Sequence, residues 1–257
     1  MKIISWNVNS LRARVNYINE LLQTEEPDFL CLQETKIIDK EFPDKSFNEL
    51  GYFSYFFGIP SYNGVAILSK KKLMNIEKLD FCNKQDARII SAQTSGFDIM
   101  SVYVPAGGDT PDPNINPKFK YKLLFLDELN QLLKTKKEII LCGDLNVAPY
   151  EDDVWSHKSL INIVSHTEIE REKLKKILED CNLIDAVRRF VNPPQNVYTW
   201  WSYRSPNYKT NNRGRRLDHI WISKEIKNKL VNSKILDEYR SKNKPSDHVP
   251  VCLEMKN

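Results

Sequence analysis

The sequence predicts an α/β fold in which helices cover β-sheets. Three observations lead to this class. The chain opens as strand, helix, strand; its middle contains several apolar strand-like runs in succession; and two long segments of helical periodicity follow. Helices that alternate with stretches of consecutive strands are typical of sheets covered by helices.

The opening elements are read from two apolar runs and one helical pattern. Residues 2–7 (KIISWN) read as a buried strand. Residues 14–26 read as a helix because apolar side chains recur on one helical face. Residues 27–34 (PDFLCLQE) read as a second apolar strand, opened by a proline. This order favours a layered α/β arrangement.

The middle of the chain reads as three strands in succession, at residues 64–70, 86–94 and 97–105. Short turns separate them, and Gly96 lies in one of these turns. Consecutive strands with short connections favour an antiparallel meander.

Helices and strands alternate again in the second half. The segments that read as helices are 118–135 and the charged, amphipathic 168–183. The segments that read as strands are 138–146, 215–223 and 249–255. No linker, repeat or low-complexity tract interrupts the sequence, so we expect one domain over residues 1–257.

The composition excludes some classes and permits others. The 257 residues carry a net charge of +4, which permits a nucleic-acid partner if the basic residues cluster. Five cysteines, an odd number with no CxxC pair, indicate free thiols in a reducing compartment, so we expect a cytoplasmic location. No apolar run approaches the roughly 20 residues of a membrane span, and the start lacks a signal-peptide pattern.

Polar residues collect where the apolar strands end. These residues are Asn7, Gln33, Glu34, Tyr103, Asp144, Asn146, Asp218, Asp247 and His248. Strand ends meet at an edge of the fold, where sites of α/β proteins form. The "SDH" of residues 246–248 is therefore read as part of a site, although any one of these residues alone is more often a cap or turn residue.

Carboxylates that converge repel one another unless a cation joins them. The set contains carboxylate and amide oxygens, one imidazole and no thiolate, which suits Mg²⁺ or Mn²⁺ rather than zinc. Mg²⁺ keeps waters and substrate phosphate oxygens in its shell, so the pattern indicates a phosphodiester substrate.

Six stretches in order resemble the exonuclease III family of bacterial AP endonucleases, within the deoxyribonuclease I-like metal phosphodiesterases. They are ISWNVNSLRAR, CLQETK, VYVPAGG, LCGDLNVAP, NRGRRLDHIWIS and PSDHVPV, and the likeness runs from residue 2 to about residue 253. The resemblance implies a four-layer α/β sandwich of two packed mixed sheets flanked by helices. It also implies a Mg²⁺-dependent (Mn²⁺ as substitute) hydrolase of base excision repair, which cleaves duplex DNA 5′ to abasic sites. Family members often add 3′→5′ exonuclease and 3′-phosphatase or phosphodiesterase activity.

The same resemblance implies roles for single residues. The implied metal-site residues are Asn7, Glu34, Asp144, Asn146, Asp247 and His248. The implied catalytic residues are Tyr103, Asp144, Asn146, Asp218 and His248, with Asp218 as the carboxylate partner of the imidazole. Asn146, Tyr103 and His248 would oppose charge on the phosphate. Whether Asp144 or Tyr103 is the general base stays open, as does the number of metal ions.

Residues 198–219 combine aromatic, amide and arginine side chains, a pattern expected of a loop that enters DNA. The expected DNA-binding residues are Lys122, Trp200, Arg204, Asn212, Arg213, Arg215, Leu217 and His248. Trp200 and Leu217 match walls of the family's abasic pocket, whereas Arg215 replaces a tryptophan of some relatives. Strand alternation turns His219 away from the site.

Two other functions stay open for the sequence alone. One is a phosphodiesterase of the same superfamily that acts on inositol phosphates, phospholipids or RNA. The other is a catalytically inactive DNA-binding module. For the leading reading we expect a monomer, associated with the bacterial nucleoid and not with membranes, whose partner is double-stranded DNA with abasic sites or blocked 3′ ends.

Overall fold

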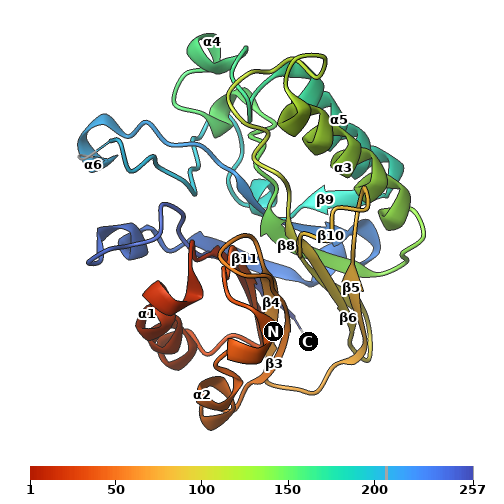
Figure 1. Ribbon diagram of the computed structural model, residues 1–257, viewed down its shortest axis with the longest axis vertical. Coiled ribbons are helices and arrows are strands. Elements are labelled where there is room, and N and C mark those ends of the chain that lie inside the picture. Colours follow the sequence, from red (N-terminus) through yellow and green to blue (C-terminus); the bar gives the residue numbers. More distant parts are fainter. Residues whose placement is uncertain (206–207, 257) are drawn as a thin grey trace.

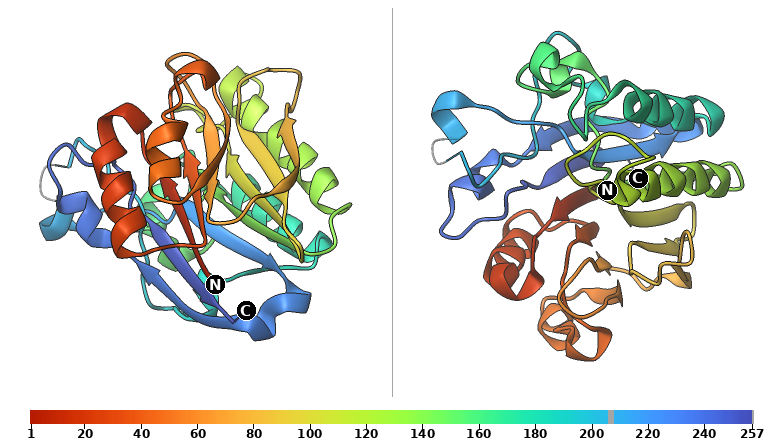
Figure 2. Two further views of the ribbon diagram at one scale, coloured as in Figure 1. Left: turned by 90° about the horizontal axis from the view of Figure 1, so that it is seen from below. Right: turned by 45° about the horizontal axis from the view of Figure 1, so that its top comes forward.

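Two six-stranded sheets pack face to face, and helices cover both outer surfaces (Figure 1). The structure, a computed structural model, describes residues 1–205 and 208–256. Figure 2 shows α1 and α2 beside one sheet and α3 and α5 beside the other. The four-layer sandwich is therefore confirmed.

The first sheet is mixed, because β1 and β2 are parallel and its other neighbours are antiparallel. In order across the sheet, its strands are β11 (Leu230–Ile235), β12 (Val251–Met255), β1 (Lys2–Asn7), β2 (Phe29–Gln33), β4 (Val65–Ser69) and β3 (Phe53–Phe57).

The second sheet repeats this plan, with β7 and β8 as its parallel pair. Its strands in order are β5 (Met74–Leu79), β6 (Ile89–Gln93), β7 (Asp98–Tyr103), β8 (Ile139–Asp144), β10 (Asp218–Ser223) and β9 (Leu183–Asp185). The helices are α1 (Leu11–Thr24), α2 (Asp44–Glu49), α3 (Pro117–Leu133), α4 (His157–Leu160), α5 (Glu168–Asp180) and α6 (Tyr208–Asn211).

The central strands read as unbroken apolar runs because both of their faces are buried. In β1, Ile3 joins the core between the sheets, whereas Ile4 packs beneath α1. In β8, Ile140 faces the same inter-sheet core and Leu141 packs beneath α3 and α5. None of the helices in the described part of the chain is long and apolar enough to span a membrane.

The expected antiparallel meander is only partly present. Strands β6 and β7 pair as predicted, but β4, predicted as the first strand of the meander, lies in the other sheet between β2 and β3. The strand that pairs with β6 on its far side is β5, whose side chains are mostly exposed. An exposed edge strand has no apolar run to reveal it, so the sequence reading passed over it.

The register brings several strand ends to one edge of the sandwich. Asn7 lies opposite Gln33 in the first sheet, and Tyr103 lies opposite Asp144 in the second. Asp144 also lies opposite Asp218 of the antiparallel β10. Because the two sheets pack face to face, the polar residues that end these strands meet between them.

Candidate active site

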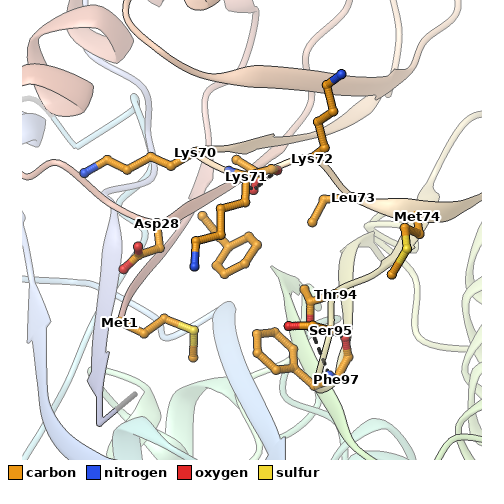
Figure 3. A pocket seen from close by; sticks show the side chains of 12 residues that line it. Met1, Asp28, Lys70, Lys71, Lys72, Leu73, Met74, Thr94, Ser95 and Phe97 are labelled. Atoms are coloured by element: carbon orange, nitrogen blue, oxygen red, sulfur yellow. Dashed lines mark hydrogen bonds between the residues drawn. The ribbon is translucent and has the colours of Figure 1, made fainter.

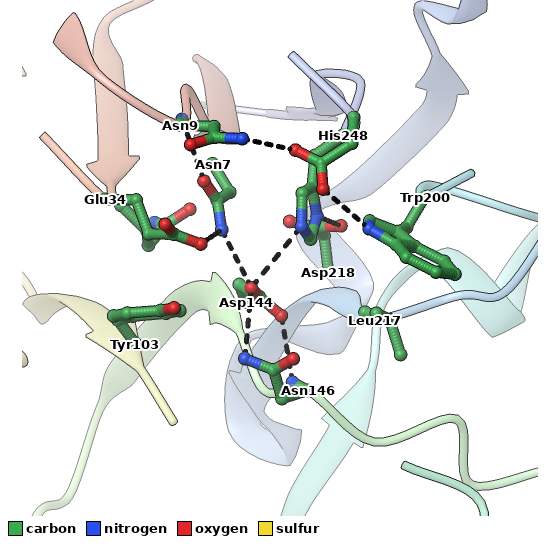
Figure 4. A network of polar contacts seen from close by, with 12 residues as sticks. Asn7, Asn9, Glu34, Tyr103, Asp144, Asn146, Trp200, Leu217, Asp218 and His248 are labelled. Atoms are coloured by element: carbon green, nitrogen blue, oxygen red, sulfur yellow. Dashed lines mark hydrogen bonds and ion pairs between the residues drawn. The ribbon is translucent and has the colours of Figure 1, made fainter. Parts of the chain in front are cut away.

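Three side chains from different parts of the chain converge at this edge. Glu34, Asp144 and His248 each offer a ligand atom within 4.8 Å of the others (Figure 4). Glu34 follows β2, Asp144 ends β8, and His248 precedes β12, so both sheets contribute. The grouping that the sequence predicted is therefore present.

The backbone around the site turns sharply at several non-glycine residues. Glu34 has φ 51° and Asn146 has φ 53°, in the left-handed region that side chains other than glycine rarely adopt. Such conformations concentrate at functional sites, where the surrounding contacts maintain them.

Asn7 and Lys36 hold the Glu34 carboxylate. The Asn7 Nδ2 donates to both Glu34 Oε1 and Asp144 Oδ2 at 2.8 Å, so one amide joins the two carboxylates. The Lys36 ammonium lies 2.8 Å from Glu34 Oε2. Burial opposes ionisation of Glu34, yet Lys36 and the Asn7 amide hold the pKa of its carboxyl below the ordinary value. Glu34 is therefore an anion.

His248 is paired with Asp218, as the resemblance implied. Its Nδ1 lies 2.8 Å from Asp218 Oδ2, which also accepts a hydrogen bond of 2.6 Å from the Thr199 hydroxyl. Burial disfavours a charged imidazole, but the Asp218 and Asp144 carboxylates outweigh it and raise the pKa of His248 to about 10. The Nε2 side of the ring faces Asp144 Oδ2 at 3.7 Å. The protonated His248 ring can therefore donate from Nε2 to an anion in the site.

Asp144 occupies the centre of the hydrogen-bond network. Its Oδ1 accepts from the Asn146 backbone N–H at 2.9 Å, and its Oδ2 accepts from the Asn7 amide at 2.8 Å. Burial raises the pKa of the Asp144 carboxyl to about 7, and the Asp218 and Glu34 carboxylates add to the rise, although His248 and Asn7 oppose it. A carboxyl with this pKa is suited to accept a proton near neutral pH.

Tyr103 stands beside these carboxylates as a neutral phenol. Burial raises the pKa of its hydroxyl well above the ordinary value, and the Glu34 and Asp144 carboxylates add to the rise. The Arg88 guanidinium lies 4.7 Å from the ring centroid and donates to the Tyr103 carbonyl at 3.2 Å. These contacts fix the ring at the mouth of the site.

A cavity of about 530 Å³ opens beside the cluster. Its wall includes Val164, Ser165, Trp200, Arg204, Arg215 and Leu217. Trp200 donates from Nε1 to Asp247 Oδ2 at 2.9 Å, and Asn9 Nδ2 donates to Asp247 Oδ1 at 2.9 Å. Both Asp247 oxygens thus have partners, and Asp247 lies outside the group of three convergent ligand atoms.

A second cavity, of about 340 Å³, lies at the opposite edge of the sandwich, where β2 and β7 begin (Figure 3). Phe29 and Phe97 contribute its apolar wall, and lysines 70–72 surround it. The convergent carboxylate and imidazole groups belong to the first cavity alone among the described residues.

The expectation that Lys122 binds DNA is wrong, because its ammonium is not available to DNA. The side chain is fully buried, and its Nζ lies 2.5 Å from Glu170 Oε1. The same Nζ donates to the Asn146 carbonyl at 2.8 Å and to the Ala106 carbonyl at 3.3 Å. Lys122 therefore supports the active-site loop from behind.

The other expected DNA-binding residues occupy varied positions. Arg204, Asn212 and Arg213 are exposed, and the Arg213 guanidinium lies 4.8 Å from the centroid of the Trp155 ring. Residues 206 and 207 of this segment lie outside the described residues. His219 points to the opposite face of β10, where its Nε2 lies 2.9 Å from the Val147 carbonyl oxygen, as strand alternation predicts.

The sequence reading missed several supporting residues. Asn9, Lys36 and Thr199 bond directly to site carboxylates, and Arg88 holds Tyr103. Asn9 and Lys36 lie inside the quoted stretches NVNS and QETK, so their neighbourhood was the available signal.

Arg14 connects the start of α1 to the loop before His248. It donates to the Asn9 carbonyl and to the Pro245 carbonyl at 2.6 Å each. Arg12 is exposed and pairs with Glu41. Arg14 therefore has a structural role at the start of α1.

Known proteins resemble this chain in both sequence and fold. The chain is 32% identical over 272 residues to exodeoxyribonuclease III of Haemophilus influenzae, with 100% of each chain covered. It is also 32% identical over 257 residues to recombination repair protein 1 of Drosophila melanogaster, where the match covers 98% of this chain but only 37% of that protein.

Two solved structures superpose over 100% of both chains. An AP endonuclease from Archaeoglobus fulgidus gives a TM-score of 0.93 at 33% identity. A 3′ phosphatase from Neisseria, bound to a product DNA hairpin, gives 0.91 at 30% identity. The model of the endonuclease/exonuclease/phosphatase family matches residues 4–248, and the chain therefore belongs to that family.

Proposed function

We propose that this protein is a divalent-metal-dependent DNA repair nuclease that cleaves the phosphodiester bond 5′ to abasic sites in duplex DNA. It would add 3′→5′ exonuclease and 3′-phosphatase or phosphodiesterase activity. The observation that supports this most is the convergence of Glu34, Asp144 and His248 on a cavity with an aromatic wall. Relatives named exodeoxyribonuclease III and AP endonuclease support the same function.

The residues present fit a hard divalent cation. Glu34 and Asp144 supply carboxylate oxygens, and no thiolate lies in the group, so Mg²⁺ is the preferred ion and Mn²⁺ its substitute. Such an ion, when bound, would polarise the phosphoryl oxygen and stabilise the leaving alkoxide. His248, whose Nδ1 faces Asp218, is better placed to donate to the phosphate than to bind a metal.

Asp144 is the general base in this proposal. Its carboxyl has a pKa near neutrality and lies among fixed donors, so it can orient and deprotonate the attacking water. Tyr103 keeps its proton because its pKa is raised, and it therefore acts as a hydrogen-bond donor to the phosphate. Asn146 and His248 would donate to the same phosphate and oppose the negative charge that develops in the transition state.

The aromatic and apolar wall suits a displaced sugar. Trp200 and Leu217 line the cavity beside the catalytic cluster, where they would contact an abasic sugar turned out of the duplex. Exposed Arg204, Asn212 and Arg213 would bind phosphates of duplex DNA. The protein would act as a monomer in the bacterial cytoplasm, close to the nucleoid.

The test is cleavage of a duplex that carries a single abasic site, with and without EDTA, followed by mapping of the 3′ ends. Cleavage 5′ to the site that needs a divalent ion supports the proposal. Asp144→Asn should lose about 10²-fold or more in rate while it still binds DNA. Glu172→Gln, an exposed carboxylate on α5, is the control and should behave as wild type.

The alternatives give different results in the same assay. Faster hydrolysis of an inositol phosphate, phospholipid or RNA than of the abasic duplex would assign the site to another phosphoester. DNA binding without cleavage of any of these substrates would identify an inactive binding module.

A further inference from the structure

Arg215 places a cation on the wall of the active-site cavity. Side chains of an extended segment alternate in direction, so Arg215 and Leu217 share one face and Arg216 points to the other. Arg215 and Leu217 both line the cavity. Arg216 is fully buried on the far side, where it pairs with Asp153 at 2.8 Å and with Asp185 at 2.7 Å. Alternation thus fixes which arginine faces the substrate.

The Arg215 side chain is held in a defined position. Its Nη1 donates to Ser165 Oγ at 2.6 Å and to the Val164 carbonyl at 3.2 Å. The guanidinium carbon lies 5.5 Å from the centroid of the Trp200 ring. A guanidinium held on one nitrogen and stacked on an aromatic ring loses little conformational freedom when it binds an anion.

Backbone pairing sets the distance between the backbones of Arg215 and His248, the residue proposed to donate to the phosphate. Arg215 forms an antiparallel bridge with Trp200, and Trp200 forms another with His248. Adjacent paired segments lie about 4.8 Å apart, so two bridges place the Arg215 backbone roughly 10 Å from that of His248. Both residues line the same cavity.

Among the described residues, no carboxylate lies within ion-pair distance of Arg215, and the carboxylate that acts on its charge, Glu170, already pairs with Lys122. The neighbouring cations Lys36, Lys122 and Arg216 each form an ion pair with a carboxylate. Arg215 forms no such pair, and its protein hydrogen bonds use Nη1 only. The other charged groups that line the cavity away from the cluster are Asp247, whose oxygens accept from Trp200 and Asn9, and the exposed Arg204 and Asp109. The remaining donors of Arg215 are therefore open to a ligand.

We propose that Arg215 is a specificity-determining residue, which favours substrates with a terminal 3′-phosphate monoester over abasic sites within the duplex. This inference rests on the proposed function of the same site. In an internal phosphodiester, the cavity side of the scissile phosphate carries a neutral sugar. In a 3′-terminal monoester, the same side carries unesterified oxygens with a further negative charge. A guanidinium already held beside the cavity binds the unesterified oxygens and gains little from the neutral sugar.

The reaction on this substrate is a hydrolysis that needs no further reactant. Water attacks the phosphorus atom and forms a new P–O bond, while the bond between phosphorus and the 3′ oxygen breaks. The proton of the attacking water passes to Asp144 and then to solvent. The 3′ oxygen leaves with the electron pair of that bond and takes a proton from solvent to become a hydroxyl group, and orthophosphate is released.

The test compares two substrates built on one duplex: a nick that ends in a 3′-phosphate, and a single abasic-site analogue. For each enzyme, kcat/KM is measured on both, and the ratio of 3′-phosphate to abasic activity is the readout. Arg215→Gln should lower this ratio about tenfold or more, the effect of one charge-assisted hydrogen bond. Arg215→Lys should give an intermediate ratio, because lysine keeps the charge without the planar fork.

The matched control is Arg189→Gln, the same change at an exposed arginine that neither lines the cavity nor belongs to the expected DNA-binding residues. This variant should leave the ratio within about twofold, a change far below that of one such bond. An equal loss on both substrates in Arg215→Gln, or an unchanged ratio, would overturn the assignment.

Melting temperatures accompany the kinetics because Arg215 also bonds Ser165. If Arg215→Gln does not fold, the ratio in Arg215→Lys decides, and a ratio equal to that of wild type refutes the role. Wild-type protein that cleaves neither substrate would refute the proposed function itself. If the wild-type protein cleaves both substrates but the variants at residue 215 leave the ratio unchanged, only the selectivity is refuted.

Discussion

Asp144 and Tyr103 lie side by side at the end of paired strands, yet their environments suit them to different tasks. The Asp144 carboxyl titrates near neutrality and accepts three hydrogen bonds, from the Asn7 and Asn146 side chains and the Asn146 backbone. The Tyr103 hydroxyl is buried next to carboxylates, which raise its pKa and keep it protonated. Both pKa values are raised, but the rise brings the Asp144 carboxyl close to neutrality and takes the Tyr103 hydroxyl further from it. The sequence alone left the identity of the general base open, because these shifts arise from burial and from neighbours distant in the chain.

This difference predicts unequal losses on mutation. Tyr103→Phe removes one hydrogen-bond donor to the phosphate and should lower kcat on an abasic duplex about 10- to 100-fold. Asp144→Asn removes the base and should lower kcat at least tenfold further. Single-turnover rates at saturating enzyme measure both. A larger loss in Tyr103→Phe than in Asp144→Asn would instead make the tyrosine the base.

At the scale of elements, the sequence identified the strands that are buried on both faces and missed those at exposed positions. Strands β1, β2, β7 and β8 are nearly continuous apolar runs. By contrast, the side chains of β5 are mostly exposed, and those of β11 are exposed or half-buried. A half-buried or exposed strand is stabilised by its hydrogen-bonded neighbour, which a single sequence does not reveal. The same limit explains why β4 was assigned to the wrong neighbours.

Lys122 shows how an element can serve the site without reaching the substrate. From α3, its ammonium bonds the Asn146 carbonyl after β8 and the Glu170 carboxylate in the first turn of α5. Glu170 in turn accepts from the backbone N–H of Ser165 and of Thr167. One buried ion pair therefore joins three elements behind the catalytic loop, and sequence spacing gave no sign that this lysine is buried.

We expect Lys122→Met to lower the free energy of unfolding by about 3–5 kcal/mol, because it leaves the Glu170 charge buried without a partner. The double variant Lys122→Met with Glu170→Gln removes that charge and should recover part of the stability. Its kcat should stay reduced, because the Asn146 carbonyl still lacks its donor. Urea unfolding and abasic-site cleavage test the two effects separately.

Full recovery of activity in the double variant would show that the pair contributes stability alone. Lys120→Met, an exposed lysine on the same helix, is the control and should change neither quantity.

At the scale of the whole molecule, the site exists only when the two sheets are packed together. Asn7 and Glu34 come from the first sheet, and Tyr103 and Asp144 come from the second. The order of the motifs allowed the sequence to predict this assembly, through a family likeness that covers nearly the whole chain. The network of buried charges behind the cavity had no motif and was not predicted.

That network makes stability depend on pH. Burial opposes ionisation of Asp185, yet the Arg216 guanidinium and His219 hold the pKa of its carboxyl well below the usual range. A carboxyl with a depressed folded-state pKa stabilises the protein fully above its unfolded pKa of about 3.9, and this contribution decreases as the pH falls below that value.

Asp185→Asn should therefore lower the free energy of unfolding at pH 7, by about 3 kcal/mol for a broken buried pair. The difference from wild type should shrink by about 1.4 kcal/mol for each pH unit below about 3.9. Urea unfolding of both proteins between pH 7 and pH 3 measures it. A gap that stays constant or widens as the pH falls would contradict the linkage to Asp185.

In the proposed function, Glu34 and Asp144 bind a divalent ion beside a phosphate-binding histidine. The most direct measurement is the anomalous difference map of a crystal soaked in MnCl₂. We expect a strong peak between the Glu34 and Asp144 carboxylates, absent from crystals of Glu34→Gln. A map without a peak there, or with its strongest peak at another surface and none near Glu34, would contradict it.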